Sequence, residues 1–321
     1  MVDKQPTSLS PVRHRKTQRT FTVPSIEKAM LSSLRRCIET TGESLHISSR
    51  YQAQRVLYRS DASPTVIELY VEQNSGKEVV VKRTLRAKVV SALQWVSARR
   101  ELEIHRNLSH PNLVELLDGA ETAEEVLLVL EYVPLHDYFT QRIEVNNNPF
   151  CAKKDGGIAK FKSFTFDIVS GLAYLHSQGI VHLDLKPGNL LVSKAVDPDQ
   201  YPLVKLCDLG LARRVGEDGC AAVEKRCGSS FYIAPEVGNQ SRVTTGADMW
   251  SLGVLLHLMA VGFPPHALRW KPGEDLKFSP RYWRKFESTG LQDFLVCCLR
   301  LRPEERLTAV QGLGHPWLQS A

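Results

Sequence analysis

Residues 181–192 read VHLDLKPGNLLV, and this stretch decides what kind of chain this is. Four polar residues, His182, Asp184, Lys186 and Asn189, stand at close spacing among apolar neighbours. Side chains of these types, brought together in one loop, are candidates for catalytic work. The stretch therefore raises the question of whether it is a working catalytic loop or a disabled copy of one.

The composition is that of an ordinary globular protein. The chain has 321 residues, 43% of them apolar and 24% charged, which is enough for a large core in one or two domains. Its seven cysteines are scattered, without a C-x-x-C pair or zinc spacing, which favours a reducing compartment. We therefore expect a cytoplasmic or nuclear protein. It shows no secretory signal, and its longest apolar stretch is too short for a transmembrane segment.

The positive charge is concentrated at the amino-terminal end. The net charge is +6, and residues 1–50 hold nine basic and four acidic residues. The remainder is nearly neutral, which argues against nucleic acid as a partner.

The amino-terminal 50 residues divide into two parts. Residues 1–23, rich in Ser, Thr, Pro and basic residues, are expected to be a disordered basic tail, either plainly solvated or serving as a nuclear address. Residues 24–50 are expected to form an amphipathic helix, over 24–40, and a linker. The apolar residues of this helix recur at helical spacing: Ile26, Met30, Leu34, Cys37 and Ile38. This stripe could dock on the following domain or on a partner.

From Tyr51 onward the pattern predicts a small β-rich lobe followed by a larger helical one. Strand-like runs at 55–58, 65–71 and 79–83 include a hairpin turn at QNSGKE. A helix at about 89–108 and two more strand-like runs follow. The clearest later helices are FKSFTFDIVSGLAYLHSQG and GADMWSLGVLLHLMAVG, the second apolar on all sides and therefore buried. The expected lobes are 51–132 and 133–318.

Motifs spread over 51–318 resemble a eukaryotic protein kinase of the Ser/Thr type, similar to the calmodulin-dependent kinase group. In order, they are VVVK (79–82), HLDLKPGN (182–189), CDLG (207–210) and APE (234–236). The resemblance implies an α+β, bilobal protein-kinase fold, with a five-stranded β lobe that carries one large helix and a larger α-helical lobe. It also implies ATP and Mg²⁺ as cofactors and a protein hydroxyl as acceptor.

The resemblance assigns four residues to catalysis. Lys82, a cation inside an apolar strand, needs an anion, and in the family it holds the α/β-phosphates and pairs with a Glu. Glu101 is the best candidate for that Glu, and Glu103 is the alternative. Asp184 would orient the substrate hydroxyl, and Lys186 would sit near the γ-phosphate.

The resemblance also assigns the nucleotide and metal ligands. Asn189 and Asp208 would bind Mg²⁺ through their hard oxygens. The remaining expected cofactor-binding residues would sandwich adenine (Val66, Val80 and Leu191), belong to the hinge segment 131–133 whose backbone would hydrogen-bond adenine (Glu131 and Val133), or follow this hinge (Asp137). Scaffold roles are implied for a Glu236–Arg306 ion pair, for Asp248, which would tie its helix to the catalytic loop, and for Ser229, which would bridge Asp184 and Lys186.

The glycine-rich loop of the family is missing. Counting back from Val66 places its three glycines at Arg59, Asp61 and Pro64. Glycine there lets backbone N–H groups approach the phosphates, whereas Pro has no N–H and Asp would repel phosphate. We expect weaker ATP binding or slower turnover.

A second departure concerns regulation. Leu183 replaces the Arg that, in the family, binds a phosphate on the activation loop. The corresponding segment, 208–236, has no Thr, and Lys225 stands where a phosphoacceptor is often found. Activity is therefore not expected to depend on phosphorylation of this loop. Of three acids that related kinases use to select basic substrates, only Asp137 is kept; Gly188 and Leu258 replace the others.

Three functions compete on this evidence. The first is a Ser/Thr protein kinase. The alternative is a pseudokinase scaffold that binds nucleotide weakly or not at all, which the missing glycines favour and the retained Lys82, Asp184 and Asp208 oppose. A small-molecule phosphotransferase is disfavoured because the APE motif, Asp248 and Arg306 belong to the substrate lobe of protein kinases.

Overall fold

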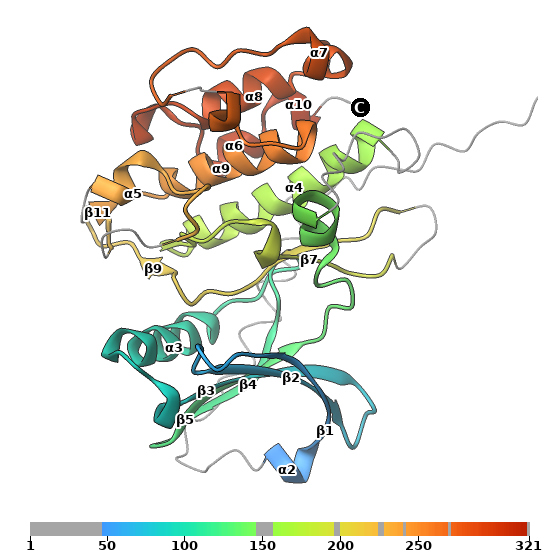
Figure 1. The fold of residues 1–321 in the computed structure, drawn as a ribbon, viewed down its shortest axis with the longest axis vertical. Helices are drawn as coiled ribbons and strands as arrows, with labels where there is room; N and C mark the ends of the chain where they lie inside the picture. The colour runs from blue at the N-terminus through green and yellow to red at the C-terminus, as the bar shows by residue number, and fades with distance from the viewer. Residues whose placement is uncertain are drawn as a thin grey trace, which may run out of the picture.

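A computed structural model of the chain describes residues 47–145, 157–195, 200–223, 228–239, 242–268 and 271–319. Figure 1 shows a β-rich lobe built from the first part of the chain and a helical lobe built from the rest. The predicted tail (1–23) and the predicted helix (24–40) lie outside the described residues. Among the helices that the structure describes, none has the length and apolar character needed to cross a membrane.

The small lobe is a five-stranded antiparallel sheet of order β1-β2-β3-β5-β4. A short helix, α2 (Ile47–Arg50), precedes its strands: β1 (Tyr51–Arg59), β2 (Thr65–Glu72), β3 (Glu78–Leu85), β4 (Leu116–Glu121) and β5 (Glu125–Glu131). The β2–β3 turn contains Gly76 at φ 69°, a left-handed conformation that glycine adopts without strain. This confirms the hairpin turn that QNSGKE predicts.

The two faces of the sheet carry different side chains because strand residues alternate. Lys82 in β3 lies opposite Ile67 in β2 and Leu128 in β5, so these three share a face. Helix α3 (Ala92–His105), which follows the short helix η1 (Arg86–Lys88), covers this face and packs Trp95 and Leu102 against it. Lys82 therefore points toward α3.

The helical lobe is organised around two long helices, α4 (Gly157–Ser177) and α6 (Gly246–Val261). Helix α6 is buried over nearly its whole length, as its apolar sequence predicts, and it ends at Gly262, where φ is 91°. Shorter helices complete the lobe: η2 (Thr140–Val145), η4 (Pro187–Asn189), α5 (Pro235–Asn239), η5 (Pro265–Leu268), α7 (Pro280–Trp283), η6 (Arg284–Phe286), α8 (Leu291–Cys298), η7 (Pro303–Glu305), α9 (Ala309–Leu313) and α10 (Pro316–Gln319).

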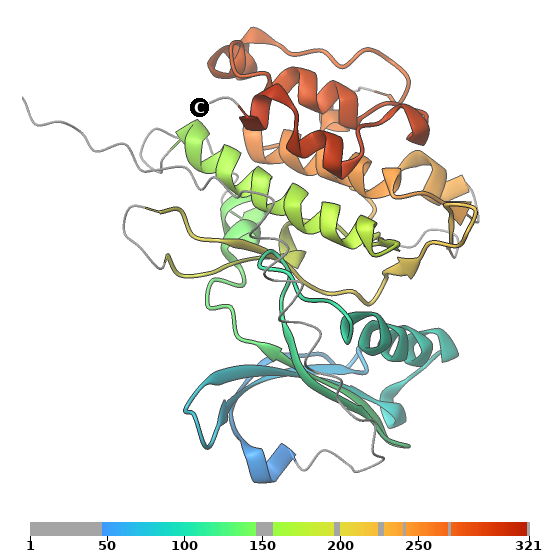
Figure 2. The same ribbon diagram turned by 180° about the vertical axis from the view of Figure 1, so that it is seen from behind.

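Two short strand pairs lie on the side of the helical lobe that faces the sheet, as the view from behind in Figure 2 shows: β6 (Ile180–Val181) with β9 (Arg213–Arg214), and β7 (Leu190–Val192) with β8 (Val204–Leu206). A third pair, β10 (Ala221–Ala222) with β11 (Arg242–Val243), lies beside α5. Asn112 and Val114, which precede β4, hydrogen-bond to Leu206 at 2.8 and 2.9 Å. This contact holds the ends of β7 and β8 against the small lobe.

Candidate functional site

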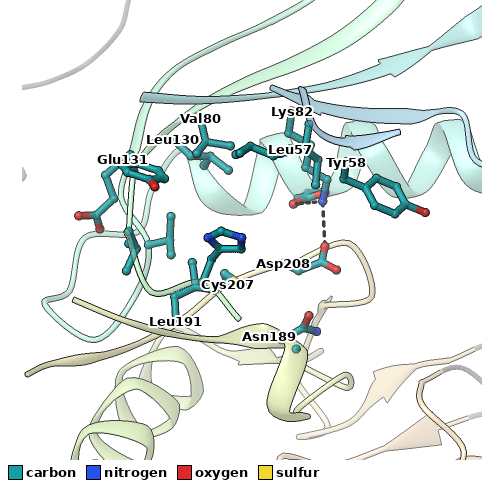
Figure 3. A pocket seen from close by; sticks show the side chains of 17 residues that line it. Leu57, Tyr58, Val80, Lys82, Leu130, Glu131, Asn189, Leu191, Cys207 and Asp208 are labelled. Carbon is teal, nitrogen blue, oxygen red and sulfur yellow. Dashed lines mark hydrogen bonds and ion pairs between the residues drawn. The ribbon is translucent and has the colours of Figure 1, made fainter. Parts of the chain in front are cut away.

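The centre of the site is a three-way contact at Lys82. Its Nζ lies 2.8 Å from both carboxylate oxygens of Glu101 on α3 and 2.8 Å from Oδ1 of Asp208, which follows β8. Figure 3 shows the Lys82 side chain reaching from the sheet to Asp208. Glu101, rather than Glu103, is therefore the partner of Lys82, and one side chain links sheet, α3 and the helical lobe.

The electrostatics of this contact keep Lys82 charged. Burial alone acts to lower the pKa of the ammonium group, but the carboxylates of Asp208 and Glu101 outweigh it and hold the pKa above its usual range. The Lys82 ammonium in turn keeps the pKa of Asp208 below the ordinary range of a carboxyl group. The site thus holds a fixed cation beside an ionised carboxylate, an arrangement suited to a polyanion and a divalent metal.

Two adjoining hollows lie between the lobes around this contact. The inner one, of ≈ 260 Å³, is lined mainly by apolar side chains, including those of Leu57, Val80, Leu130 and Leu191 (Figure 3). The outer one, of ≈ 760 Å³, has a more polar lining, which includes Lys186 and Asn189. An apolar slot that opens into a polar hollow can hold a flat ring and its charged substituent.

Two of the expected cofactor-binding residues do not line the inner hollow. Val66 was expected against the adenine ring, but it lies on the opposite face of the sheet, and Ile67, the cross-strand neighbour of Lys82, lines the hollow. Asp137, which follows the hinge as expected, does not line the hollow, whereas its neighbour His136 does. The other expected residues, Val80, Glu131, Val133 and Leu191, do line it.

Because Ile67 takes the place expected for Val66, the three positions where the family has glycine shift by one residue, to Ser60, Ala62 and Thr65. None of them is glycine. The turn satisfies its own amides. Ala62 N–H donates to Ser60 Oγ at 3.3 Å and Thr65 N–H donates to Ser63 Oγ at 3.2 Å. Ser63 N–H donates to the Ser60 carbonyl at 3.3 Å. These N–H groups are therefore engaged within the turn, not directed toward a ligand.

The loop of residues 182–189 brings its polar side chains together around Asp184. Lys186 Nζ lies 2.6 Å from Asp184 Oδ2, and Asn189 Nδ2 donates to the same oxygen at 3.0 Å. Ser229 Oγ donates to Asp184 Oδ1 at 2.8 Å. These three side chains thus surround one carboxylate that is largely buried, and of the bridge expected for Ser229 the contact to Asp184 is present.

The backbone of this loop is held by Asp248 at the start of α6. Asp248 accepts hydrogen bonds from the N–H groups of His182 and Leu183, both at 2.8 Å, and lies 2.9 Å from His176. Burial opposes ionisation of Asp248, but the bonds from His176 and His182 hold its pKa below the usual value. The carboxylate therefore ties α6 to the loop, as the sequence predicts.

Asn189 and Asp208 each have a side-chain oxygen that no contact to Asp184 or Lys82 occupies. The amide nitrogen of Asn189 donates to the main-chain oxygen of Asp184 at 2.8 Å and to its side chain, which leaves Oδ1 free to face the hollow that Asn189 lines. Asp208 offers its second carboxylate oxygen beside the one that contacts Lys82. An amide and a carboxylate oxygen are ligands that suit Mg²⁺.

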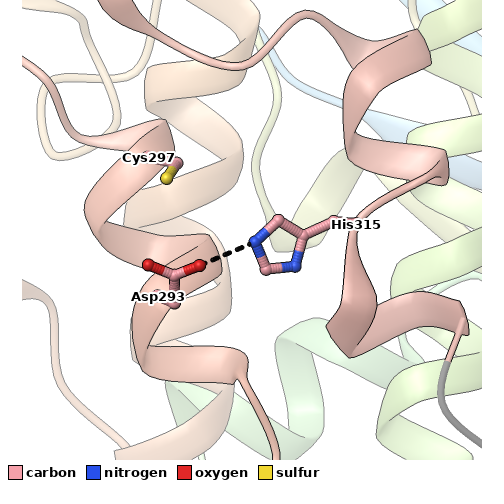
Figure 4. Close-up of side chains that lie close together, drawn as sticks. All are labelled: Asp293, Cys297 and His315. Atoms are coloured by element: carbon pink, nitrogen blue, oxygen red, sulfur yellow. Dashed lines mark hydrogen bonds and ion pairs between the residues drawn. The ribbon is translucent and has the colours of Figure 1, made fainter.

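Asp293 and Cys297 in α8 and His315 before α10 form a second cluster of potential metal ligands (Figure 4). The ligand atoms lie within 4.8 Å of one another. However, His315 Nδ1 accepts the Trp317 N–H at 3.2 Å, so the proton is on Nε2, which donates to Asp293 at 3.0 Å. No lone pair on Nε2 faces the cluster. We interpret His315 as the cap of α10.

Sequence reasoning missed several residues that line the inner hollow: Leu57, Tyr58, Ile67, Val114, His136 and Cys207. Ile67 could have been found by counting across the β2–β3 hairpin turn to the position opposite Lys82. Leu57 and Tyr58 depend on irregular pairing in β1, where register shifts interrupt the ladder to β2. The sequence carries no signal for that irregularity. Lys225, the other expected departure, lies outside the described residues.

Similarity to known proteins extends over both lobes of the chain. The family profile "Protein kinase domain" matches residues 63–318. Human serine/threonine-protein kinase DCLK3 is 34% identical over 285 residues, which cover 86% of this chain and 41% of that protein. A probable myosin light chain kinase of Dictyostelium discoideum is 30% identical over 261 residues, covering 79% of this chain and 63% of that protein. The chain thus spans less than two thirds of these relatives.

Proposed function

Because the chain belongs to the protein kinase family, we propose that it transfers the γ-phosphoryl group of Mg·ATP to serine or threonine hydroxyls of protein substrates. The observation that carries this proposal is the simultaneous contact of Lys82 with Glu101 and Asp208, each at 2.8 Å. Burying a cation and two carboxylates has a large desolvation cost, which points to a functional role for Lys82. The Lys82 side chain lines the hollow that would receive the phosphates.

Each residue of the site would have a separate role in binding Mg·ATP or in phosphoryl transfer. The main-chain N–H and C=O of Val133, which have no partner among the described residues, would hydrogen-bond adenine in the inner hollow. Lys82 would hold the α/β-phosphates, and Asn189 and Asp208 would hold Mg²⁺, which neutralises phosphate charge when bound. Asp184 would accept a hydrogen bond from the substrate hydroxyl and orient it, while Lys186 stabilises charge on the transferred group.

The proposed activity does not depend on phosphorylation of the segment after Asp208. Leu183 is buried and packs in the core of the helical lobe, so it offers no charge to a phosphate. The Asp184 cluster and the Lys82 contact are nevertheless assembled. A site that is assembled without a phosphate-binding Arg supports an enzyme that is active without phosphorylation of this segment.

A pseudokinase scaffold remains the alternative, and one observation favours it. The β1–β2 turn engages its own N–H groups at Ala62, Ser63 and Thr65, so it contributes little to phosphate binding. In this case nucleotide would bind weakly or not at all, and the protein would act through its surfaces.

Transfer of labelled γ-phosphate from Mg·ATP to a generic Ser/Thr substrate tests the proposal, with Asp184→Asn as the comparison. We expect the wild type to incorporate label and Asp184→Asn to lose at least about a hundredfold in rate, because the hydroxyl is no longer oriented. Thermal shifts with Mg·ATP should be similar for both proteins. A folded wild type that neither transfers label nor shifts with Mg·ATP would establish the scaffold instead.

A further inference from the structure

A large aromatic side chain is exposed beside the proposed transfer site. Phe231 is 68% exposed, which is unusual for a residue of this type. It lies two residues after Ser229, whose hydroxyl contacts Asp184 at 2.8 Å. Since two residues span at most about 7 Å, Phe231 lies close to the path by which a substrate hydroxyl would reach Asp184.

The ring of Phe231 does not project alone. It stacks on the imidazole of His266 in η5, with ring centroids 5.5 Å apart and an interplanar angle of 3°. We call these two side chains the Phe231–His266 platform. One face of the Phe231 ring rests on His266, and the exposed remainder forms a flat surface for another side chain.

The backbone around Phe231 is fixed from both sides. The N–H of Tyr232 donates to the Ser229 carbonyl at 2.9 Å. The carbonyl of Tyr232 accepts a hydrogen bond from Ser251 Oγ of α6 at 2.8 Å. Tyr232 itself is buried. The platform is therefore held in place before anything binds, which lowers the entropy cost of binding.

The platform pairs an apolar ring with an imidazole. Partial burial acts to lower the pKa of His266, which favours its neutral form near pH 7. Within the described residues 228–239 the acidic side chain is Glu236, and it is buried in a pair with Arg306. Residues 262–268 add no acidic side chain. A basic substrate residue would find no carboxylate in these two segments.

We propose that the Phe231–His266 platform binds an aliphatic or aromatic side chain of the protein substrate and gives the enzyme a preference for apolar over basic residues at that position. This inference rests on the proposed kinase function. An extended substrate advances about 3.3 Å per residue, so the platform contacts a residue about two to four positions from the phosphorylated hydroxyl.

A peptide series tests this preference. Each peptide has one serine, with Ala, Leu or Arg placed in turn at each of the flanking positions, and kcat/KM is measured for each. We expect Leu to exceed Ala roughly tenfold at one position, with no gain for Arg. Phe231→Ala and His266→Ala should bring the ratio of Leu to Ala at that position close to one, and His266→Phe, which keeps a stacked ring, should restore it.

Val310→Ala is the matched control, because Val310 is 67% exposed on α9 and lies in a different element; it should keep the wild-type ratio. Binding of the same peptides, measured by fluorescence anisotropy without nucleotide, separates the two proposals. Preferential binding of the Leu peptide without phosphorylation would support the platform and remove the kinase function. Equal use of Leu and Ala, or a preference for Arg, would overturn the platform whatever the enzyme's activity.

Discussion

At the scale of single residues, backbone conformation explains how the catalytic loop tolerates Leu183. Leu183 and Asp208 both adopt left-handed conformations, with φ of 66° and 63°. Asp is found there several-fold more often than most residues, whereas a bulky Leu is rarely found there. The Leu183 N–H is held by Asp248 at 2.8 Å, so Asp248 imposes the loop conformation whichever side chain stands at 183. Under the proposed function, Leu183 in place of Arg therefore leaves the loop without a phosphate-binding group while its backbone stays held by Asp248.

Restoring glycine to the β1–β2 turn should raise activity. In the triple variant Ser60→Gly, Ala62→Gly, Thr65→Gly, the Ser60 hydroxyl no longer competes for the turn amides, and the backbone can approach phosphate closely. We expect kcat/KM for ATP to rise roughly tenfold, the gain of about one added charge-assisted hydrogen bond.

The matched control places three glycines in the β2–β3 turn, away from both hollows: Gln73→Gly, Asn74→Gly and Ser75→Gly. It should leave the kinetics unchanged. An equal rise in both triple variants would show that general loosening of the lobe, rather than phosphate contact, is responsible.

At the scale of secondary-structure elements, α3 joins the separate parts of the site. It contacts Lys82 through Glu101, the carbonyl of Gly210 through the Ser97 hydroxyl, and the carbonyl of Val114 through His105 Nε2 at 2.7 Å. The His105 contact is buried, and its Nδ1 has no hydrogen-bond partner among the residues that the structure describes. A proton on Nδ1 would therefore place an unpaired charge in the core.

This geometry predicts a pH dependence of stability. Burial lowers the pKa of His105 to about 4, from about 6.5 in the unfolded chain. The unfolded chain then binds a proton that the folded protein does not, so the free energy of unfolding falls as pH decreases from about 6.5 toward 4. His105→Gln keeps an N–H donor that does not titrate. Its free energy of unfolding, from urea denaturation at pH 7, 5.5 and 4.5, should decline less steeply than that of the wild type.

Burial also lowers the pKa to about 4 for half-buried His110 and for buried His257, so His105→Gln removes only part of the slope. Parallel pH profiles of wild type and variant would show that His105 is protonated without cost in the folded protein, and would contradict this account of its burial.

At the scale of the whole molecule, the buried pair Glu236–Arg306 joins distant parts of the helical lobe. Arg306 contacts both oxygens of Glu236, at 2.6 and 2.8 Å, and donates to the carbonyls of Gly246, Arg300 and Leu301. It also lies over the Trp250 ring, 5.0 Å from the centroid. One guanidinium thus connects α5, α6 and the chain that follows α8.

Glu236→Gln should destabilise the protein strongly, because it leaves the buried Arg306 charge without a counterion. We expect a loss of about 3–5 kcal/mol in the free energy of unfolding, measured by urea denaturation. Glu305→Gln is the control: it removes an exposed pair with Arg302 at 3.6 Å and should cost less than about 1 kcal/mol. Similar small losses in both variants would mean that Arg306 reaches water when its partner is removed.

Much of the site was predictable because its polar residues have a chemical reason for their spacing. The pairing of Lys82 with Glu101, the cluster around Asp184 and the Glu236–Arg306 pair all follow from motifs, and the structure brings each together. The error at Val66 arose where no chemistry constrained the count. Side chains alternate in a strand, so a slip of one residue moves an apolar residue to the other face.

The sequence by itself determined the family, the order of strands and helices, and the charged residues of the site, because a charge that must meet a phosphate, a metal or a counterion tolerates few replacements. Only the tertiary structure decided that Ile67 and His136 line the cavity, that the β1–β2 turn engages its own amides, and that Phe231 and His266 meet as one platform. These features depend on strand register, turn geometry and contacts between segments distant in sequence. Many different side chains are compatible with each of them, so the sequence alone does not specify them.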